Sequence, residues 1–299
     1  MACFGFFAPS GFIRDAQAVE RAAERLRSLG HIVVLDESLL CCETRFAGDD
    51  ATRLAAIERI AADSRVDVAV ALRGGYGLTR LLDRIDFARL AASGKVWVGH
   101  SDFTAFQCGL LRAGGVSLHG PMVVSDFGAE SVSDFTFEHF GRMLETGHDG
   151  LRIDVEQGWC GALEGPLWGG NLSMLAHLVG TPWMPVVDGG ILYLEDVAEP
   201  PFRIERMLHQ LYFSGVLDRQ RALLLGDFGG YRPGATDNGF DFDAMVRYLR
   251  ERFDVPILTG LPFGHVADKL SLPFGGIAVL KSDERGWSLD YQLEGVTKS

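Results

Sequence analysis

Short apolar runs alternate with amphipathic stretches through the first half of the chain, and no other feature of the sequence constrains the fold as strongly. The apolar runs are residues 3–8, 31–35, 66–72 and 96–99, and the amphipathic stretches are residues 15–29 and 49–63. Strands that alternate with helices pair in parallel through βαβ units. A run such as 66–72, apolar along most of its length, is typical of a strand buried on both faces. We therefore predict an α/β first half built on a parallel sheet.

The second half has a different pattern. Periodicity fades between residues 145 and 169 in a stretch rich in glycine that could carry one strand. We predict an N-terminal domain at 1–150, a linker at 151–168 and a C-terminal domain at 169–299. The predicted helices are 171–179, 201–213 and 241–252, and the predicted strands are 191–194, 222–226, 256–258, 270–272, 277–280 and 288–292. Because the later strands have little helix between them, the C-terminal domain should be mixed α/β or α+β.

The charge balance and the lack of long apolar segments exclude several classes of partner. The chain carries 28 Lys and Arg against 40 Asp and Glu, a net charge of −12 with histidine neutral. A nucleic-acid groove or an anionic membrane surface requires clustered positive charge instead. No stretch approaches the roughly 18 apolar residues that cross a bilayer, and residues 1–9 lack the basic start of a secretory signal. We expect a cytoplasmic protein with no nucleic-acid or membrane partner.

Metal and cofactor sites find no support in the spacing of residues. The five cysteines form no CxxC pair and no histidine belongs to an HExxH motif, the patterns typical of zinc sites. The Arg-Gly-Gly-Tyr-Gly segment at 73–77 follows the apolar run 66–72, but it matches neither of the common nucleotide-binding glycine motifs. Its glycines let the backbone offer N–H groups to a negative oxygen. We predict no metal and no cofactor.

Ser101 lies in the segment with the strongest signal for chemistry. The strand at 96–99 is followed by Ser101 and Asp102, which open a stretch with helical periodicity. Such a strand-to-helix turn presents the hydroxyl and leaves helix-start N–H groups for an oxyanion. Phe103 breaks the Gly-x-Ser-x-Gly motif, however, and Ser101 or Asp102 could simply be a helix N-cap. Both interpretations stay open on this segment alone.

A nucleophilic serine needs a base and an acid that orients the base, and the second half has both residue types near strand ends. Glu195 and Asp196 follow the strand at 191–194, where parallel sheets collect functional groups. His265 lies in a turn that contains glycine and proline. The alternatives are that a carboxylate caps the helix at 201–213 and that His265 is a solvated loop residue.

With these residues assembled, the chain resembles the LD-carboxypeptidases, the muramoyltetrapeptide carboxypeptidases of bacterial peptidoglycan recycling. The resemblance runs nearly end to end, and it is specific because many short motifs match together. The matching motifs lie at residues 8–11, 45–48, 73–77, 99–105, 120–122, 167–172, 194–196, 202–208 and 263–265.

The resemblance implies a serine peptidase with a Ser-Glu-His triad. Ser101 would be the nucleophile, His265 the base and Glu195 the acid that orients the base. An oxyanion hole formed by the backbone N–H groups of Gly75 and Asp102 is implied as well. A flavodoxin-like N-terminal domain, a mixed, partly barrel-like C-terminal domain and a homodimer belong to the same expectation.

The implied reaction is acyl transfer. Ser101 would attack the amide between the L-centre of the third residue and the terminal D-alanine of a muramoyl tetrapeptide, and water would then hydrolyse the acyl-enzyme. A carboxypeptidase must also bind a free carboxylate, for which arginine is the natural bidentate donor. The candidate substrate-binding residues are Arg73, Tyr76, Arg203 and Arg206.

Two other functions stay open. A related branch cleaves peptide-nucleotides such as microcin C and gives self-immunity, a task that calls for an aromatic residue stacked on a base. Trp159, Trp168 and Trp183 are candidates for that residue. The other possibility is a two-domain small-molecule binding protein without catalysis. The position of the predicted nucleophile, acid and base near strand ends argues against pure binding.

Overall fold

The computed structural model describes residues 1–155 and 157–293, which fold into two compact units. Unit 1 comprises Met1–Gly141 and Ala267–Phe274. Unit 2 comprises Arg142–Val266 and the described chain from Gly275 onward. No helix in the described part of the chain is long and apolar enough to cross a membrane.

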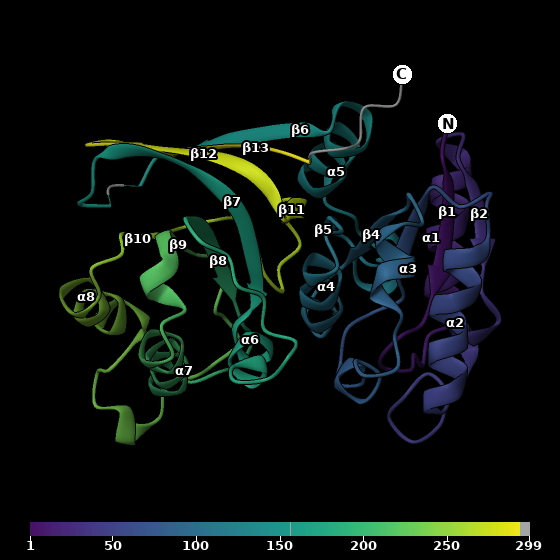
Figure 1. Cartoon of the computed structure of the whole chain (residues 1–299), viewed down its shortest axis with the longest axis horizontal. Helices are drawn as coiled ribbons and strands as arrows, with labels where there is room; N and C mark the ends of the chain where they lie inside the picture. The colour runs from purple at the N-terminus through teal and green to yellow at the C-terminus, as the bar shows by residue number, and fades with distance from the viewer. Residues whose placement is uncertain (156, 294–299) are drawn as a thin grey trace. The chain divides into compact units, whose positions relative to one another are not determined.

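Unit 1 is an α/β unit built on a six-stranded sheet of order β11-β5-β4-β3-β1-β2 (Figure 1). The five strands β1 to β5 pair in parallel, and β11 is antiparallel to β5. The order β2-β1-β3-β4-β5 is that of flavodoxin-like sheets, so the predicted fold class is confirmed. The strands are β1 (Cys3–Phe7), β2 (Ile32–Leu35), β3 (Val68–Ala71), β4 (Val96–Gly99), β5 (Ser117–His119) and β11 (Leu272–Phe274). The helices are α1 (Gln17–Ser28), α2 (Asp50–Ala62), α3 (Phe87–Ala91), α4 (Phe103–Arg112) and α5 (Asp134–Thr146), whose last turn belongs to unit 2.

The local sequence explains the central elements of unit 1. All four residues of β3, Val-Ala-Val-Ala, are buried, as expected for a central parallel strand covered on both faces. Helix α2 begins after Asp49, whose carboxylate accepts the N–H of Thr52 at 2.7 Å and so satisfies one of the free donors of the first turn. The apolar run at 66–72 therefore forms a buried strand, as predicted.

Strand β11 reaches unit 1 from the C-terminal part of the chain. The sequence predicts a strand at 270–272 within the C-terminal domain, whereas β11 pairs with β5. The segment leading into it is held by an almost fully buried ion pair between Lys269 and Asp126 at 2.7 Å. The Lys269 N–H also donates to the Thr136 hydroxyl at 2.9 Å. Periodicity identifies a strand but not its partner, which accounts for the difference.

Unit 2 contains a seven-stranded mixed sheet of order β10-β9-β8-β7-β12-β13-β6. Strands β7 to β10 are parallel, and β7, β12, β13 and β6 are antiparallel neighbours. This confirms the mixed α/β prediction. The strands are β6 (His148–Ile153), β7 (Gly161–Asn171), β8 (Gly190–Glu195), β9 (Gln220–Leu225), β10 (Ile257–Thr259), β12 (Gly276–Asp283) and β13 (Gly286–Gln292), and the helices are α6 (Leu172–Leu178), α7 (Pro201–Phe213) and α8 (Phe242–Arg252).

The sheet of unit 2 is strongly curved along β7 and β12 (Figure 1). Side chains reach the free edge of β10: Gln157 accepts the Thr259 N–H at 2.8 Å and donates to the Thr259 carbonyl at 3.1 Å. The Trp287 indole N–H donates to the same carbonyl at 3.1 Å. These bonds blunt an edge that would otherwise offer unpaired backbone groups.

The predicted linker at 151–168 contains the end of β6 and most of β7. Its glycines serve close packing as well as turns: a Cβ at Gly165 would lie 2.1 Å from the Gly189 carbonyl oxygen. Glycine inside a strand weakens the apolar pattern, so the strand in this segment leaves only a weak sign in the sequence.

Candidate active site

Ser101 lies on the turn between β4 and α4 with a φ of 64°. Left-handed backbone is uncommon for residues other than glycine and is costly unless the surroundings impose it. Asp102 occupies the N-cap position of α4, but its side chain makes no capping hydrogen bond. Neither Ser101 nor Asp102 therefore acts as a side-chain cap, and the turn has the strained strand-to-helix form expected of a nucleophile turn.

Two glycines make room for this turn. A Cβ at Gly99 would lie 2.3 Å from the Phe103 ring, and a Cβ at Gly74 would lie 2.7 Å from the Cβ of Ser101 and 2.9 Å from its Oγ. Gly75 has a φ of 86°, which favours glycine. The glycine-rich turn after β3 is therefore packed directly against Ser101 within unit 1.

The carboxyl group of Asp102 is buried below the turn. Its Oδ2 accepts the Ser10 hydroxyl at 2.7 Å and the Leu78 N–H at 2.9 Å. Burial raises the pKa of this carboxyl to about 6, because desolvation outweighs the two hydrogen bonds and the nearby Arg53 charge.

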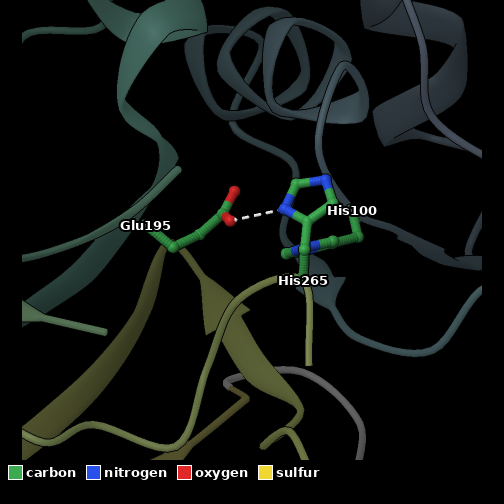
Figure 2. Close-up of side chains that lie close together, drawn as sticks. All are labelled: His100, Glu195 and His265. Carbon is green, nitrogen blue, oxygen red and sulfur yellow. Dashed lines mark hydrogen bonds and ion pairs between the residues drawn. The ribbon is translucent and has the colours of Figure 1, made fainter. Parts of the chain in front are cut away.

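In unit 2, β8 ends at Glu195, whose carboxylate meets His265. Figure 2 shows the contact, in which His265 Nδ1 lies 2.8 Å from Glu195 Oε2. Glu195 is fully buried, and burial raises the pKa of its carboxyl although the His265 contact opposes the shift. His265 is therefore oriented by a buried acid, although the residue itself is exposed.

The loop that carries His265 is held by its two preceding residues. Phe263 is buried and packs edge-on against Tyr193 of β8, with the ring centroids 5.2 Å apart. The Phe263 carbonyl accepts the Asp227 N–H at 2.8 Å. Gly264 has a φ of 145°, and a Cβ there would lie 2.9 Å from the Asp227 Cβ. The loop therefore has one close-packed path on which to present His265.

Asn171, where the predicted helix 171–179 begins, contacts both carboxylates at the end of β8. Its Oδ1 accepts the Met174 N–H at 3.1 Å, which caps α6. Its Nδ2 donates to Glu195 Oε1 at 3.1 Å and to Asp196 Oδ1 at 3.0 Å. Asn171 and Glu195 are partners in the parallel register of β7 and β8, so only knowledge of that pairing could have revealed the contact.

Asp196 differs from its predicted alternative role. The helix at Pro201–Phe213 has Pro200 at its N-cap and no side-chain cap. The Asp196 carboxylate instead accepts the N–H of Ser173 at 2.8 Å, in the first turn of α6. The sequence shows that this carboxylate lies near helix starts, but the packing of α6 beside β8 decides which helix it serves.

The candidate carboxylate-binding arginines differ in their surroundings. Arg203, on α7, pairs with Glu199 at 2.8 Å. Arg206 is an exposed residue of the same helix. Arg73 is exposed in unit 1, donates to the Phe12 carbonyl at 3.2 Å and forms no ion pair with any described residue.

Tyr76 is 45% exposed, and its ring centroid lies 6.1 Å from that of Phe46.

The predicted catalytic and oxyanion groups fall into two sets, with Ser101, Gly75 and Asp102 in unit 1 and Glu195 and His265 in unit 2. Taken separately, neither unit gathers three metal-ligating side chains among its described residues.

The chain matches family descriptions of LD-carboxypeptidases in two parts. The LD-carboxypeptidase N-terminal domain matches residues 4–120, and the LD-carboxypeptidase C-terminal domain matches residues 164–280. A murein tetrapeptide carboxypeptidase of Pseudomonas aeruginosa is 32% identical over 72% of this chain and 73% of its own length.

Solved structures of related proteins share the fold of this chain. The crystal structure of a muramoyltetrapeptide carboxypeptidase from Oxalobacter formigenes has a TM-score of 0.92 at 45% identity, over 97% of this chain and 99% of that one. The microcin C7 self-immunity protein MccF of Escherichia coli is 26% identical over 75% of this chain and 74% of its own length. Its solved structure shares the fold, with a TM-score of 0.86 at 22% identity over 98% of this chain and 96% of that one. The chain belongs to the LD-carboxypeptidase family.

Proposed function

We propose that the protein is a serine LD-carboxypeptidase that removes the terminal D-alanine from muramoyl tetrapeptide in peptidoglycan recycling. The observation that carries the proposal is the 2.8 Å contact between the buried Glu195 and His265, in a chain whose relatives include a murein tetrapeptide carboxypeptidase. A buried carboxylate bound to one ring nitrogen of histidine is the acid-base half of a serine triad.

The proposed mechanism assigns one role to each group. Because Glu195 engages Nδ1 of His265, Nε2 is the atom that takes the proton from the Ser101 hydroxyl as it attacks the scissile carbonyl. Glu195 stabilises the imidazolium that forms. The backbone N–H groups of Gly75 and Asp102 bind the oxyanion. His265 then returns the proton to the amine of the departing D-alanine, and water hydrolyses the acyl-enzyme.

Arg73 is the arginine we favour for the substrate carboxylate, with Tyr76 beside it. The Arg73 guanidinium is exposed and pairs with no described carboxylate, so it does not have to break an ion pair to bind one. Arg203 would first have to leave Glu199. Arg206 remains a candidate on exposure alone.

Cleavage of a peptide-nucleotide is the second candidate, favoured by the 26% identity to MccF. One of the three tryptophans suggested for base stacking is not available for it. Trp168 is fully buried, and its indole N–H donates to Gln220 at 2.8 Å. Trp159 and Trp183 remain for that role, since both are partly exposed.

The test is to incubate the purified protein with muramoyl tetrapeptide, with its all-L isomer and with a microcin-type peptide-nucleotide. We expect alanine release from the LD bond alone, and none from the Ser101→Ala variant. Cleavage of the peptide-nucleotide alone would select the second candidate. No turnover of any of the three would reject both activities in favour of a binding protein.

We further propose that the enzyme works as a homodimer in the cytoplasm, as the family resemblance implies. Light scattering coupled to size-exclusion chromatography should give twice the chain mass of 32.7 kDa. A monomer at concentrations that support full activity would contradict the dimer, and recovery of the native protein outside the cytoplasm after cell fractionation would contradict the location.

A further inference from the structure

Three segments that follow neighbouring strands of unit 1 are linked by the side chain of Asp102. The strands β1, β3 and β4 lie side by side in the sheet, so their carboxyl ends share one edge. Ser10 follows β1, Leu78 follows the glycine turn after β3, and Asp102 follows β4. One carboxylate oxygen, Oδ2, accepts hydrogen bonds from both Ser10 Oγ and the Leu78 N–H.

Arg53 links two of the same segments from α2. Its side chain is fully buried, and its Nη1 donates to the carbonyls of Pro9 and Gly77, both at 2.9 Å. Its other terminal nitrogen, Nη2, pairs with Asp50. The glycine turn that touches Ser101 is therefore held at Gly77 by Arg53 and at Leu78 by Asp102.

We propose that the Asp102 carboxylate is a positioning group for the oxyanion hole: it holds the 74–77 turn against Ser101 and so sets the distance between the backbone N–H groups of Gly75 and Asp102. This inference rests on the proposed function, because it takes those two N–H groups as the oxyanion donors. The carboxylate acts through the turn and does not itself touch the substrate.

The way in which Asp102 is bonded supports a positioning role. A buried carboxyl group is costly to retain unless its bonds are needed, and Oδ1 accepts no hydrogen bond from the described residues. The hydrogen bonds to Ser10 and Leu78 therefore both form at Oδ2. The adjacent Ser101 has a left-handed backbone, which persists only where neighbouring contacts impose it. Gly74, whose missing Cβ admits Ser101, is in the turn that Oδ2 secures.

The role of a single acceptor oxygen can be separated from charge by two substitutions. Asp102→Ala removes both hydrogen bonds, whereas Asp102→Asn can place its carbonyl oxygen at the Oδ2 position and keep both. Asp36 provides a control, because it also follows a parallel strand, β2, is buried, and accepts the Ser38 N–H at 2.8 Å. Asp36→Ala removes this bond, together with the two bonds from Arg59 at 2.8 and 2.9 Å, away from Ser101.

We expect Asp102→Ala to lower kcat for D-alanine release by about 10- to 100-fold, since a displacement of about 1 Å in an active site has effects of this size. KM should change by less than about threefold, because uniform substrate binding is not altered. Asp102→Asn should recover most of the loss. Asp36→Ala should match the decrease in melting temperature but keep kcat within about twofold of wild type. An equal effect on kcat of Asp102→Ala and Asp36→Ala would overturn the proposal.

Hydrogen exchange measured by mass spectrometry tests the same inference without catalysis. Peptides covering residues 73–80 should exchange faster in Asp102→Ala than in wild type, and near the wild-type rate in Asp102→Asn. Unchanged exchange in Asp102→Ala would overturn the positioning role even if activity fell. If wild type released no D-alanine, the proposed function would fail, while exchange would still decide whether Asp102 holds the turn. Should Asp102→Ala not fold, Ser10→Ala removes one of the two bonds and should show the same changes to a smaller degree.

Discussion

The two units hold their functional groups by different means. In unit 1 the position of Ser101 depends on backbone shape, because it combines a φ of 64° with glycines at positions 74 and 99 that leave no room for a side chain. In unit 2 the position of His265 depends on side-chain hydrogen bonding, through the fully buried Glu195 and its second partner Asn171. Steric constraint on the backbone distinguishes the Ser101 site, although Asp102 also secures its glycine turn. A buried hydrogen-bonded acid distinguishes the His265 site, although Gly264 also constrains its loop.

The difference predicts which substitutions should disrupt each of the two sites. A backbone-shaped site should be lost when a methyl group is added and should tolerate isosteric changes of charge nearby. A site built from hydrogen-bonded side chains should be lost when a charge is removed at constant volume. Substitutions in each unit therefore test whether the two sites differ in this way.

The largest effect should come from Ser101→Ala. Removal of the nucleophile should lower kcat by about 10⁴- to 10⁶-fold, while the melting temperature stays near wild type because only a hydroxyl is lost. Steady-state assays of alanine release and a thermal melt measure both. Ser64→Ala, at an exposed residue, is the control. If Ser101→Ala kept more than about a tenth of wild-type turnover, far above that range, the nucleophile assignment would be wrong.

Glu195→Gln tests the charge-dependent half. It keeps the volume but removes the charge that stabilises the His265 imidazolium, so kcat should fall by about 10²- to 10⁴-fold with little change in melting temperature. Asp196→Asn is the matched control, because that carboxylate accepts the Ser173 N–H at the start of α6. It should act mainly on stability, by about 1 kcal/mol. The assignment fails if the loss of activity follows Asp196→Asn while Glu195→Gln stays near wild type.

Gly74→Ala tests the steric half. The added Cβ would lie 2.7 Å from the Cβ of Ser101, so either Ser101 or the glycine turn must move. We expect kcat to fall by about 10- to 100-fold with the charge of the site unchanged. Gly141→Ala is the control, since a Cβ there meets nothing within 4 Å. Wild-type kinetics for Gly74→Ala would show that the position of Ser101 does not depend on this contact.

The last expected effect is on stability alone, a pH dependence that comes from Asp102. Burial raises its pKa from 3.8 to about 6 in the folded protein, so the folded state binds this proton more tightly than the unfolded state. The contribution to stability is therefore largest below about pH 4 and is lost as pH rises through 6, by about 3 kcal/mol. Denaturant unfolding of wild type and Asp102→Asn at pH 4 and pH 7 measures it.

The quantity to compare is the difference between the two proteins at each pH, because all other groups titrate in both. Asp102→Asn should gain stability relative to wild type between pH 4 and pH 7. A constant difference would mean that Asp102 is ionised in the folded protein at both pH values.

Local pattern was enough to predict much of this protein. The apolar runs and helical spacings of the first half indicate a parallel α/β sheet, and β1, β3 and β4 lie within the predicted runs. The position of Ser101 between a strand and a helix, and of Glu195 at a strand end, can also be predicted, because each depends on neighbours within a few positions in the chain.

Other features depend on which segments pair across long distances. The partner of β11 is β5 in unit 1, a choice that the periodicity of a short strand does not contain. The Asn171 contact with Glu195 needs the register of β7 and β8. The helix that Asp196 serves needs the packing of α6. Residue type and spacing therefore determined the kinds of group and their places along the chain, whereas only tertiary structure decided their partners, because hydrogen bonds and burial depend on distances that local periodicity does not specify.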